Sequence, residues 1–322
     1  MKETRSLMKS NQTKIESKLA SEAKVFRGGR AKSWREEVIK TTLFFCALIS
    51  VLTTFSIVFI LAQEAGGFFQ DVSVFDFIFG THWTPLLEPR SFGVLPLVCG
   101  TILIVVGAAS LALPIGLATS IYLSEYASIR IRSLLKPLLE VLAGIPTIVY
   151  GYFALTFITP LFRTFFPKIQ IFNAFSASIV VGIMILPMIA SLCDNTFRAV
   201  PDSLRQGAYA VGATQYEVTT GVVIPSALSG VMSAFVLALS RAIGETMAVT
   251  LAAGATPKMT MDPFVSIQTM TAYIVQVSLG DTPAGTIAYQ TIFAVSALLF
   301  IITLCMNIVS HRLLHRFREV YE

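Results

Sequence analysis

Charged residues are scarce in this chain of 322 residues: Asp, Glu, Lys and Arg together make up 13% of it, against 54% hydrophobic residues. A soluble protein usually carries about 25% charged residues, because that many are needed to solvate its surface. Much of this chain's surface is therefore expected to face something other than water. The same composition excludes a disordered chain, a collagen-like repeat or a nucleic-acid-binding domain as descriptions of the whole protein.

Cysteine and histidine are also few. The four cysteines, Cys46, Cys99, Cys193 and Cys305, all lie within apolar runs, and their spacing contains no CxxC pair. Neither a disulfide framework nor a metal site is expected from them. The three histidines form no HExxH pattern, and neither a GxSxG nor a Walker A sequence is present. The chain is therefore expected to be a conduit and not an enzyme, with no catalytic residues of its own.

Long apolar runs are what the sequence does contain. A helix that crosses about 30 Å of hydrocarbon needs roughly 20 apolar residues, at a rise of about 1.5 Å per residue. Six runs reach that length, so the sequence predicts an all-α membrane protein with six transmembrane helices. The runs cover residues 41–62, 93–123, 134–162, 169–193, 227–255 and 285–310.

Lys and Arg are unevenly distributed among the segments that join these runs. Nineteen lie in the N-terminal tail, the even-numbered loops and the C-terminal segment, whereas four lie in the odd-numbered loops. Short loops rich in Lys and Arg stay in the cytoplasm. Both termini are therefore expected to be cytoplasmic, in a multi-pass protein of the bacterial plasma (inner) membrane. This topology accounts for the pI near 9.0 without any nucleic acid.

The runs also predict how the chain is divided. Residues 1–37 are expected to form a mobile, basic cytoplasmic tail, and residues 38–92 a first transmembrane helix with an external loop. Residues 93–312 are expected to form a core of five transmembrane helices that includes two short cytoplasmic helices within residues 201–224. Residues 313–322 complete the chain as a cytoplasmic C-terminus.

Two serines suggest helix starts outside this core. Ser33 has capping-box spacing to Glu36, which predicts that the first helix begins at Ser33. The Phe-rich segment 68–79 of the external loop is expected to form an interfacial helix, for which Ser73 can act as the cap.

The longest even-numbered loop, residues 194–226, carries the pattern of two short helices. A proline and an aspartate precede Ser203, and Ser203-x-x-Gln206 has capping-box spacing. This helix is expected to end where Gly212 adopts a left-handed turn, and a second helix to span residues 215–223. Such a compact pair is either a plain amphipathic connector or a docking element, and the residues alone leave both open.

The fifth apolar run contains two charged residues, Arg241 and Glu245. Arg241 lies about 14 residues into the run, roughly 21 Å from its cytoplasmic end at 1.5 Å per residue. Residues four apart share one helix face, so Arg241 and Glu245 are expected to pair. Ionisable groups at this depth are costly and usually face a polar pathway. The alternative is a static ion pair that fixes helix packing.

The third run contains Pro146, which removes a backbone donor from an apolar helix. Thr147 and Tyr150 can supply hydroxyl groups near the break. Either this bend lines a path and the two hydroxyls donate to a passing oxyanion, or it is a packing kink whose hydroxyls bond back to the helix.

The 194–226 loop resembles the EAA motif of ABC-importer permeases, in which Glu-Ala-Ala is followed by three residues, Gly, nine residues and Ile-x-Leu-Pro. The matching residues here are Gln206-Gly207-Ala208, Gly212 and Val222-Val223-Ile224-Pro225. Gln206 stands where the family has Glu, and Gly207 where it has Ala. Further stretches are similar to the phosphate-specific branch of this family, the PstC-type permeases. They are Pro114–Leu117, Tyr122–Tyr126, Gly144–Gly151 and Arg241–Val249.

This resemblance implies a type I ABC importer permease with the MetI-like fold, in a high-affinity importer of inorganic phosphate. It implies as partners a sister permease (PstA), two copies of an ATPase (PstB) and an external phosphate-binding protein (PstS). ATP and magnesium would bind to the ATPase, so this chain would hold no cofactor. The resemblance places Ser203, Gln206, Gly207, Ala208 and Gly212 at the ATPase.

Other functions stay open at this point. A secondary anion transporter driven by an ion gradient would need an intramembrane carboxylate, and Glu245 is the one deep candidate. A signalling role can coexist with transport. The cargo can also be another oxyanion, such as sulfate or molybdate.

Overall fold

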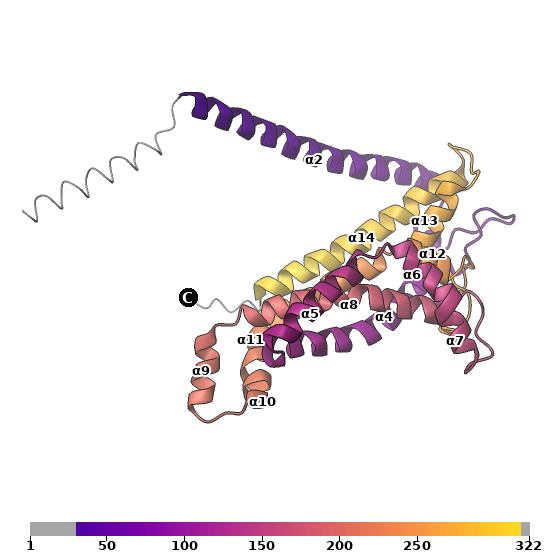
Figure 1. The fold of residues 1–322 in the computed structure, drawn as a ribbon. Helices are drawn as coiled ribbons and strands as arrows, with labels where there is room; N and C mark the ends of the chain where they lie inside the picture. The colour runs from indigo at the N-terminus through magenta and orange to yellow at the C-terminus, as the bar shows by residue number, and fades with distance from the viewer. Residues whose placement is uncertain (1–29, 317–322) are drawn as a thin grey trace, which may run out of the picture. The chain divides into compact units, whose positions relative to one another are not determined.

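The computed structural model describes residues 30–316, and within that range the chain is helical except for loops and one isolated β-bridge between Trp83 and Phe92. Most of the predicted tail, residues 1–29, and residues 317–322 lie outside this range. The helices are α2 (Arg30–Asp71), α3 (Val74–Phe79), α4 (Leu95–Ile121), α5 (Ile129–Gly144), α6 (Thr147–Phe153), α7 (Thr159–Arg163), α8 (Ala174–Arg198), α9 (Asp202–Ala210), α10 (Gln215–Val218), α11 (Ile224–Ile243), α12 (Met247–Ala252), α13 (Met270–Leu279) and α14 (Ile287–Arg316) (Figure 1). Three π-helical segments join them, η1 (Tyr122–Tyr126), η2 (Ala154–Ile158) and η3 (Thr219–Val223).

Contacts divide the chain into two compact units, residues 1–60 and residues 61–322, and the boundary falls inside α2. The described part of the first unit is one helix that begins at Arg30, so Ser33 lies inside it and is not its cap. Apolar side chains such as Phe55 and Phe59 are exposed on this helix. A helix that is apolar on all sides is typical of a membrane span.

α8 is the central helix of the second unit and packs against α4, α5, α6, α11 and α12. Small residues let α4 approach it closely: a Cβ added at Gly107 would lie 2.5 Å from Ser178 Oγ. Helices in a membrane commonly meet through small residues, because lipid is as apolar as Leu and burial alone gives no gain. α8 begins at Ala174, later than the predicted Ile169, because Asn173 Oδ1 accepts from the backbone N–H of Ser176 at 2.7 Å.

An aromatic cluster forms the core at the α3 end of the second unit. Phe77 packs edge-on against Trp83, with ring centroids 6.2 Å apart, and Trp83 against Tyr273 of α13 at 4.9 Å. Of the segment 68–79 that was predicted to form one helix, residues 74–79 form α3, whereas residues 68–71 belong to the end of α2. Phe77 of α3 packs in a buried cluster with side chains of α13 and α14. Ser73 occupies the N-cap position of α3 without making a side-chain capping hydrogen bond.

Two of the six predicted spans are broken. The third run consists of α5, which ends at Gly144, and a second stretch, 147–163, which turns from α5 by 88°. The fifth run was expected to be continuous over residues 227–255, but α11 ends at Ile243 and the short helix α12 follows. The described residues thus contain five continuous helices long and apolar enough to cross a membrane, or six when the bent pair counts as one span. The all-helical, six-span fold class is confirmed.

Candidate functional site

A cavity of about 650 Å³ lies where α11 ends. Its polar lining comes from Ser240, Arg241 and Glu245, and its apolar lining includes Ala143 of α5 and Met184 of α8. The cavity forms here because α11 stops at Ile243 and α12 begins only at Met247, which leaves a non-helical link between two helices. Non-helical backbone at membrane depth is tolerated where it lines a cavity or is buried in protein.

Arg241 and Glu245 do not pair as the sequence predicted. The two residues share no helix face because α11 ends between them, and no ion pair within 4.0 Å joins them in the described range. Glu245 is 8% exposed, and its Oε1 accepts from the backbone N–H of Ala248 at 3.2 Å. Thr246 occupies the N-cap position of α12 without a side-chain capping hydrogen bond, and the preceding Glu245 caps the helix in its place by accepting from the first turn. The exposed Arg241 side chain retains its donors for another acceptor.

Ser240 is a lining residue that the sequence reading did not single out. Its Oγ is buried and has no hydrogen-bond partner among the described residues. Buried hydroxyls nearly always have a partner, so an unpartnered one beside a cavity indicates a place where a polar ligand or water can bind. A serine next to an intramembrane arginine was the available signal in the sequence.

The two residues predicted at the break of the third run differ in their surroundings. Tyr150 is buried, and its hydroxyl donates to the backbone carbonyl of Leu142 at 2.7 Å, across the bend at Pro146. This is the arrangement expected of a packing kink. Thr147 is half-buried, and neither residue lines the Arg241 cavity. The structure thus brings Glu245 and Arg241 to one cavity and leaves Thr147 and Tyr150 outside it.

The breaks in the third and fifth runs meet at Gly151. A Cβ added there would lie 3.0 Å from Ala248 Cα and 3.0 Å from Leu251 Cβ, so α6 and α12 are in close contact. The two broken spans therefore pack directly against each other through α6 and α12. Glu245, which caps α12, lies at the start of the helix that makes this contact.

The two short helices of the 194–226 loop protrude from the opposite end of the second unit (Figure 1). Ser203, Gln206 and Gly207 lie exposed on α9. Gly212 ends the turn after α9 with φ +89°, the left-handed conformation that the sequence predicted. Ala208 is half-buried and packs against the main core.

The capping of these helices differs from the prediction. Pro201, and not Ser203, occupies the N-cap of α9, and no side chain caps it. The capping box belongs instead to α10, between Thr214 and Glu217. The second helix then continues through η3 into α11, so α10 is continuous with the helix that carries Arg241, and α9 is joined to α10 by the turn at Gly212.

Arg205 fastens α9 to the rest of the unit. Its guanidinium donates to the carbonyls of Val200 at 2.6 Å and Phe197 at 2.7 Å, and to Glu125 Oε1 of η1 at 3.2 Å. Gln215 Nε2 of α10 donates to the backbone carbonyl of Glu125 at 2.6 Å. We call Arg205, Glu125 and Gln215 the clasp. It connects both short helices to the end of the α4 span.

A second charged group lies at the same end, between α5 and α8. Asp194 is 1% exposed and accepts from Arg132 Nη2 at 2.7 Å and 2.9 Å. Lys136 and Arg198 each lie 3.6 Å from its carboxylate. A buried carboxylate is tolerated when cations compensate it, so this group fixes α5 against α8 at the α9 end. No cluster of three or more potential metal ligands occurs in residues 30–316.

Comparison with known proteins places the chain in a family. The profile of the binding-protein-dependent transport system inner membrane component matches residues 112–316. The chain belongs to this family. It is 32% identical over 260 residues to the probable ABC transporter permease protein YqgH of Bacillus subtilis, which covers 80% of this chain and 84% of that protein. It is 33% identical over 271 residues to the phosphate transport system permease protein PstC of Mesorhizobium japonicum. That match covers 78% of this chain and 82% of the relative.

The fold also matches solved transporters. A chain in the crystal structure of a bacterial ABC transporter that imports the acidic polysaccharide alginate superimposes with a TM-score of 0.61. The match covers 88% of this chain and 99% of that chain at 13% identity, so it concerns the fold alone. The importer-permease fold implied by the EAA-like motif is confirmed, and so is the resemblance to PstC-type permeases.

The clasp and the Asp194 group, like Ser240, were not predicted from the sequence. Arg205 and Glu125 are 80 positions apart, and Arg132 and Asp194 are 62 apart. The arginines were considered only for the distribution of positive charge, and Glu125 only as part of the stretch Tyr122–Tyr126. An acidic residue at the end of an apolar run, such as Asp194, was the signal that could have pointed to a cationic partner.

Proposed function

We propose that this chain is the transmembrane permease subunit of an ATP-driven, high-affinity importer of inorganic phosphate. Its partners would be a sister permease of the PstA type, two copies of a PstB-type ATPase and an external phosphate-binding protein of the PstS type. ATP and magnesium would be bound and used by the ATPase alone. The α9 end would face the cytoplasm, together with both termini, because nineteen Lys and Arg residues belong to that side.

The observation that carries this proposal is Arg241 at the cavity between α11 and α12. An arginine stays charged at any working pH and presents a planar fork of donors that matches a phosphate oxygen pair. Arg241 has no carboxylate within ion-pair distance in the described range, and the unpartnered Ser240 hydroxyl lies beside it. In this proposal Arg241 contacts phosphate during translocation, with a contact weak enough to release it.

Coupling to ATP hydrolysis would run through α9. The exposed surface of Ser203, Gln206 and Gly207, with Ala208 and Gly212 behind it, would dock on the ATPase. The rigid passage from α10 through η3 into α11 supports this role, because a push on α9 and α10 would reach the helix that ends at Arg241. Thr147 remains a proposed lining residue of the path in another state of the transporter.

A gradient-driven mechanism has one observation in its favour. Glu245 is a buried carboxylate at the same cavity, and no cation pairs with it among residues 30–316. Such a group can take up a proton in a secondary transporter. That mechanism, however, leaves the exposed surface of α9 without a role.

Purification and transport together test the proposal. The tagged chain, expressed with the other genes of its system, is expected to co-purify with an ATPase, a second permease and a phosphate-binding protein. Proteoliposomes of that complex are expected to take up radiolabelled phosphate when ATP is supplied to the ATPase side, and not when a pH gradient replaces ATP. Sulfate and molybdate, supplied with their own label, serve as controls for the cargo. Uptake driven by the pH gradient alone would favour the second mechanism.

A further inference from the structure

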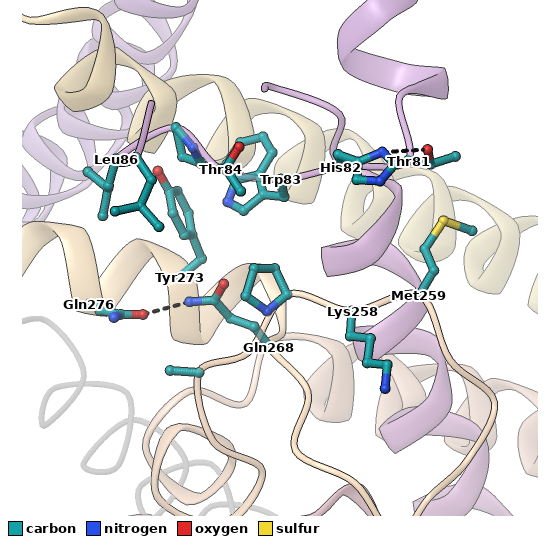
Figure 2. A pocket seen from close by; sticks show the side chains of 14 residues that line it. Thr81, His82, Trp83, Thr84, Leu86, Lys258, Met259, Gln268, Tyr273 and Gln276 are labelled. Carbon is teal, nitrogen blue, oxygen red and sulfur yellow. Dashed lines mark hydrogen bonds between the residues drawn. The ribbon is translucent and has the colours of Figure 1, made fainter. Parts of the chain in front are cut away.

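A second cavity, of about 790 Å³, lies at the α3 end of the unit, away from α9. It is formed by the loop that leads to α4, the loop after α12 and one face of α13 (Figure 2). The walls are largely apolar, with Leu86 and Met259 among them. The proposed path of phosphate through the Arg241 cavity does not include this second cavity.

Trp83 provides a buried hydrogen-bond donor at this cavity. The residue is 2% exposed, and its Nε1–H has no acceptor among the described residues. Figure 2 shows the indole nitrogen on the side of the ring that turns toward Tyr273 and Gln268. A buried N–H without an acceptor costs free energy, so it indicates a place where an acceptor-bearing ligand would be stabilised.

Gln268 and Gln276 supply groups of both kinds. Gln268 Nε2 donates to Gln276 Oε1 at 2.6 Å (Figure 2), which leaves the amide N–H groups of Gln276 and the carbonyl oxygen of Gln268 for a ligand. Gln268 is 3% exposed as a residue, and its hydrogen bond to the exposed Gln276 orients its carbonyl oxygen as an acceptor at the cavity. The site therefore offers donors together with one acceptor.

The charge of the lining is positive. Lys258 contributes an ammonium group, and none of the described residues that line the cavity is Asp or Glu. Figure 2 shows the Lys258 ammonium directed away from Trp83 and Gln268. Lys258 is exposed on a flexible stem, so it supplies positive potential at the rim and no fixed hydrogen bond.

We propose that this cavity binds a protonated phosphate group. Its oxygens would accept from Trp83 Nε1–H and the Gln276 amide, and its P–OH would donate to the Gln268 carbonyl. Sulfate carries no proton at neutral pH and would leave that carbonyl unpaired. The apolar walls and the volume accommodate either free inorganic phosphate or the phosphomonoester headgroup of a lipid such as phosphatidic acid. The site is separate from Arg241 and does not depend on the proposed transport reaction.

Trp83 itself can report binding, because the chain contains only two tryptophans. The full chain carrying Trp34→Phe is purified in dodecyl maltoside, a detergent without phosphate, and Trp83 emission is followed during titration. Inorganic phosphate and soluble short-chain phosphatidic acid form the two arms, and sulfate at equal ionic strength is the control. We expect a saturable change with at least one phosphate species, at a midpoint roughly ten-fold or more below that of sulfate. The arm that responds identifies the source.

Matched lysine variants locate the response. Lys258→Gln is expected to raise the midpoint of the phosphate titration by roughly two- to five-fold, because an exposed charge contributes little to binding energy. Lys168→Gln, at an exposed lysine that does not line the cavity, is expected to leave it unchanged. Arg241→Gln is expected to leave it unchanged as well, which separates this site from the proposed path. A flat titration in both phosphate arms, a sulfate midpoint equal to that of phosphate, or equal effects of the two lysine variants would overturn the inference.

Discussion

At the scale of single residues, the cavity at the end of α11 combines one guanidinium and one carboxylate that do not neutralise each other. Glu245 is occupied in capping α12, through the backbone N–H of Ala248 at 3.2 Å. Arg241 is exposed to the cavity. A passing anion would thus meet an available cation and a fixed negative charge together, which favours weak binding and fast release.

Glu245→Gln separates these two roles of the carboxylate. The amide keeps an oxygen that can accept from Ala248, so α12 stays capped, while the negative charge is lost from the cavity. Removing the negative charge of Glu245 would remove its repulsion of the bound phosphate, which costs roughly 1 kcal/mol or more. The phosphate concentration for half-maximal uptake is therefore expected to fall several-fold. Uptake by the reconstituted complex is the measurement, and the loss of rate should be smaller than that caused by Arg241→Gln.

Glu245→Ala is the companion variant, because it removes the charge and the cap together. Loss of a helix cap costs about 1 kcal/mol, so this variant is expected to be less stable to heat than Glu245→Gln. Equal and severe loss of uptake in both variants would mean that the carboxylate charge itself is required, as a gradient-driven mechanism needs.

Tyr150→Phe tests the bend at Pro146. The phenol hydroxyl donates to Leu142 across the bend, so its removal should cost about 0.5–1 kcal/mol and lower the thermal unfolding midpoint of the detergent-solubilised chain. The phosphate concentration for half-maximal uptake should not change. Thr147→Val is the matched variant, and its half-buried hydroxyl has no hydrogen-bond partner in the described range, so little loss of stability is expected. A large change in phosphate affinity for Tyr150→Phe would contradict this interpretation.

At the scale of elements, the shape of the α9–α10 pair depends on Gly212. Its φ of +89° is unfavourable for any residue with a Cβ, although an added Cβ would meet no other atom within 4 Å. Gly212→Val should therefore cost about 1–2 kcal/mol through the backbone alone. On the proposed coupling role, ATP-driven uptake and transport-coupled ATP hydrolysis should both fall, while membrane insertion is unaffected.

Gly221→Val is the control for this change. Gly221 lies in η3 with a negative φ, and an added Cβ there also meets nothing within 4 Å. It should therefore disturb coupling far less than Gly212→Val. Normal coupled ATPase activity in Gly212→Val would count against the docking role of α9.

The clasp predicts a different defect. Arg205→Gln removes the fork that joins α9 to Glu125 and to the end of α8, while the exposed face of α9 stays intact. A charge-assisted hydrogen bond is worth about 1.5–3 kcal/mol, so its loss should loosen α9 and lower the phosphate imported per ATP hydrolysed. The complex should still assemble. Arg130→Gln, at an exposed arginine near the same end, is the control, and an equal effect of both variants would contradict the role of the clasp.

What could be predicted from the sequence was set by local chemistry. The number of spans could be predicted because the thickness of a membrane requires apolar runs of a certain length. The end of α9 could be predicted because a left-handed turn favours glycine, here Gly212. The end of α11 between Arg241 and Glu245 was missed, since the apolar pattern continues through it. Long-range pairs such as Arg205 with Glu125 depend on how the spans are arranged, which periodicity does not reveal.

At the scale of the whole molecule, continuous structure joins the proposed docking surface on α9 to the Arg241 cavity. The α9–α10 pair leads through η3 into α11, α11 ends at the cavity, and α12 contacts α6 at Gly151. The clasp adds a second connection, from α9 to the end of α4. This arrangement suits a subunit in which a push at one end changes the access to a cavity within the membrane.

Phosphate uptake by a complex that carries Arg241→Gln tests the central claim most directly. The variant complex, reconstituted in proteoliposomes with its ATPase and phosphate-binding protein, should assemble normally. Its ATP-driven phosphate uptake should fall by roughly ten-fold or more, because the charged fork is lost. Arg241→Lys keeps the charge without the fork and should retain partial uptake. Wild-type phosphate uptake by Arg241→Gln would contradict the proposal that Arg241 contacts the transported anion.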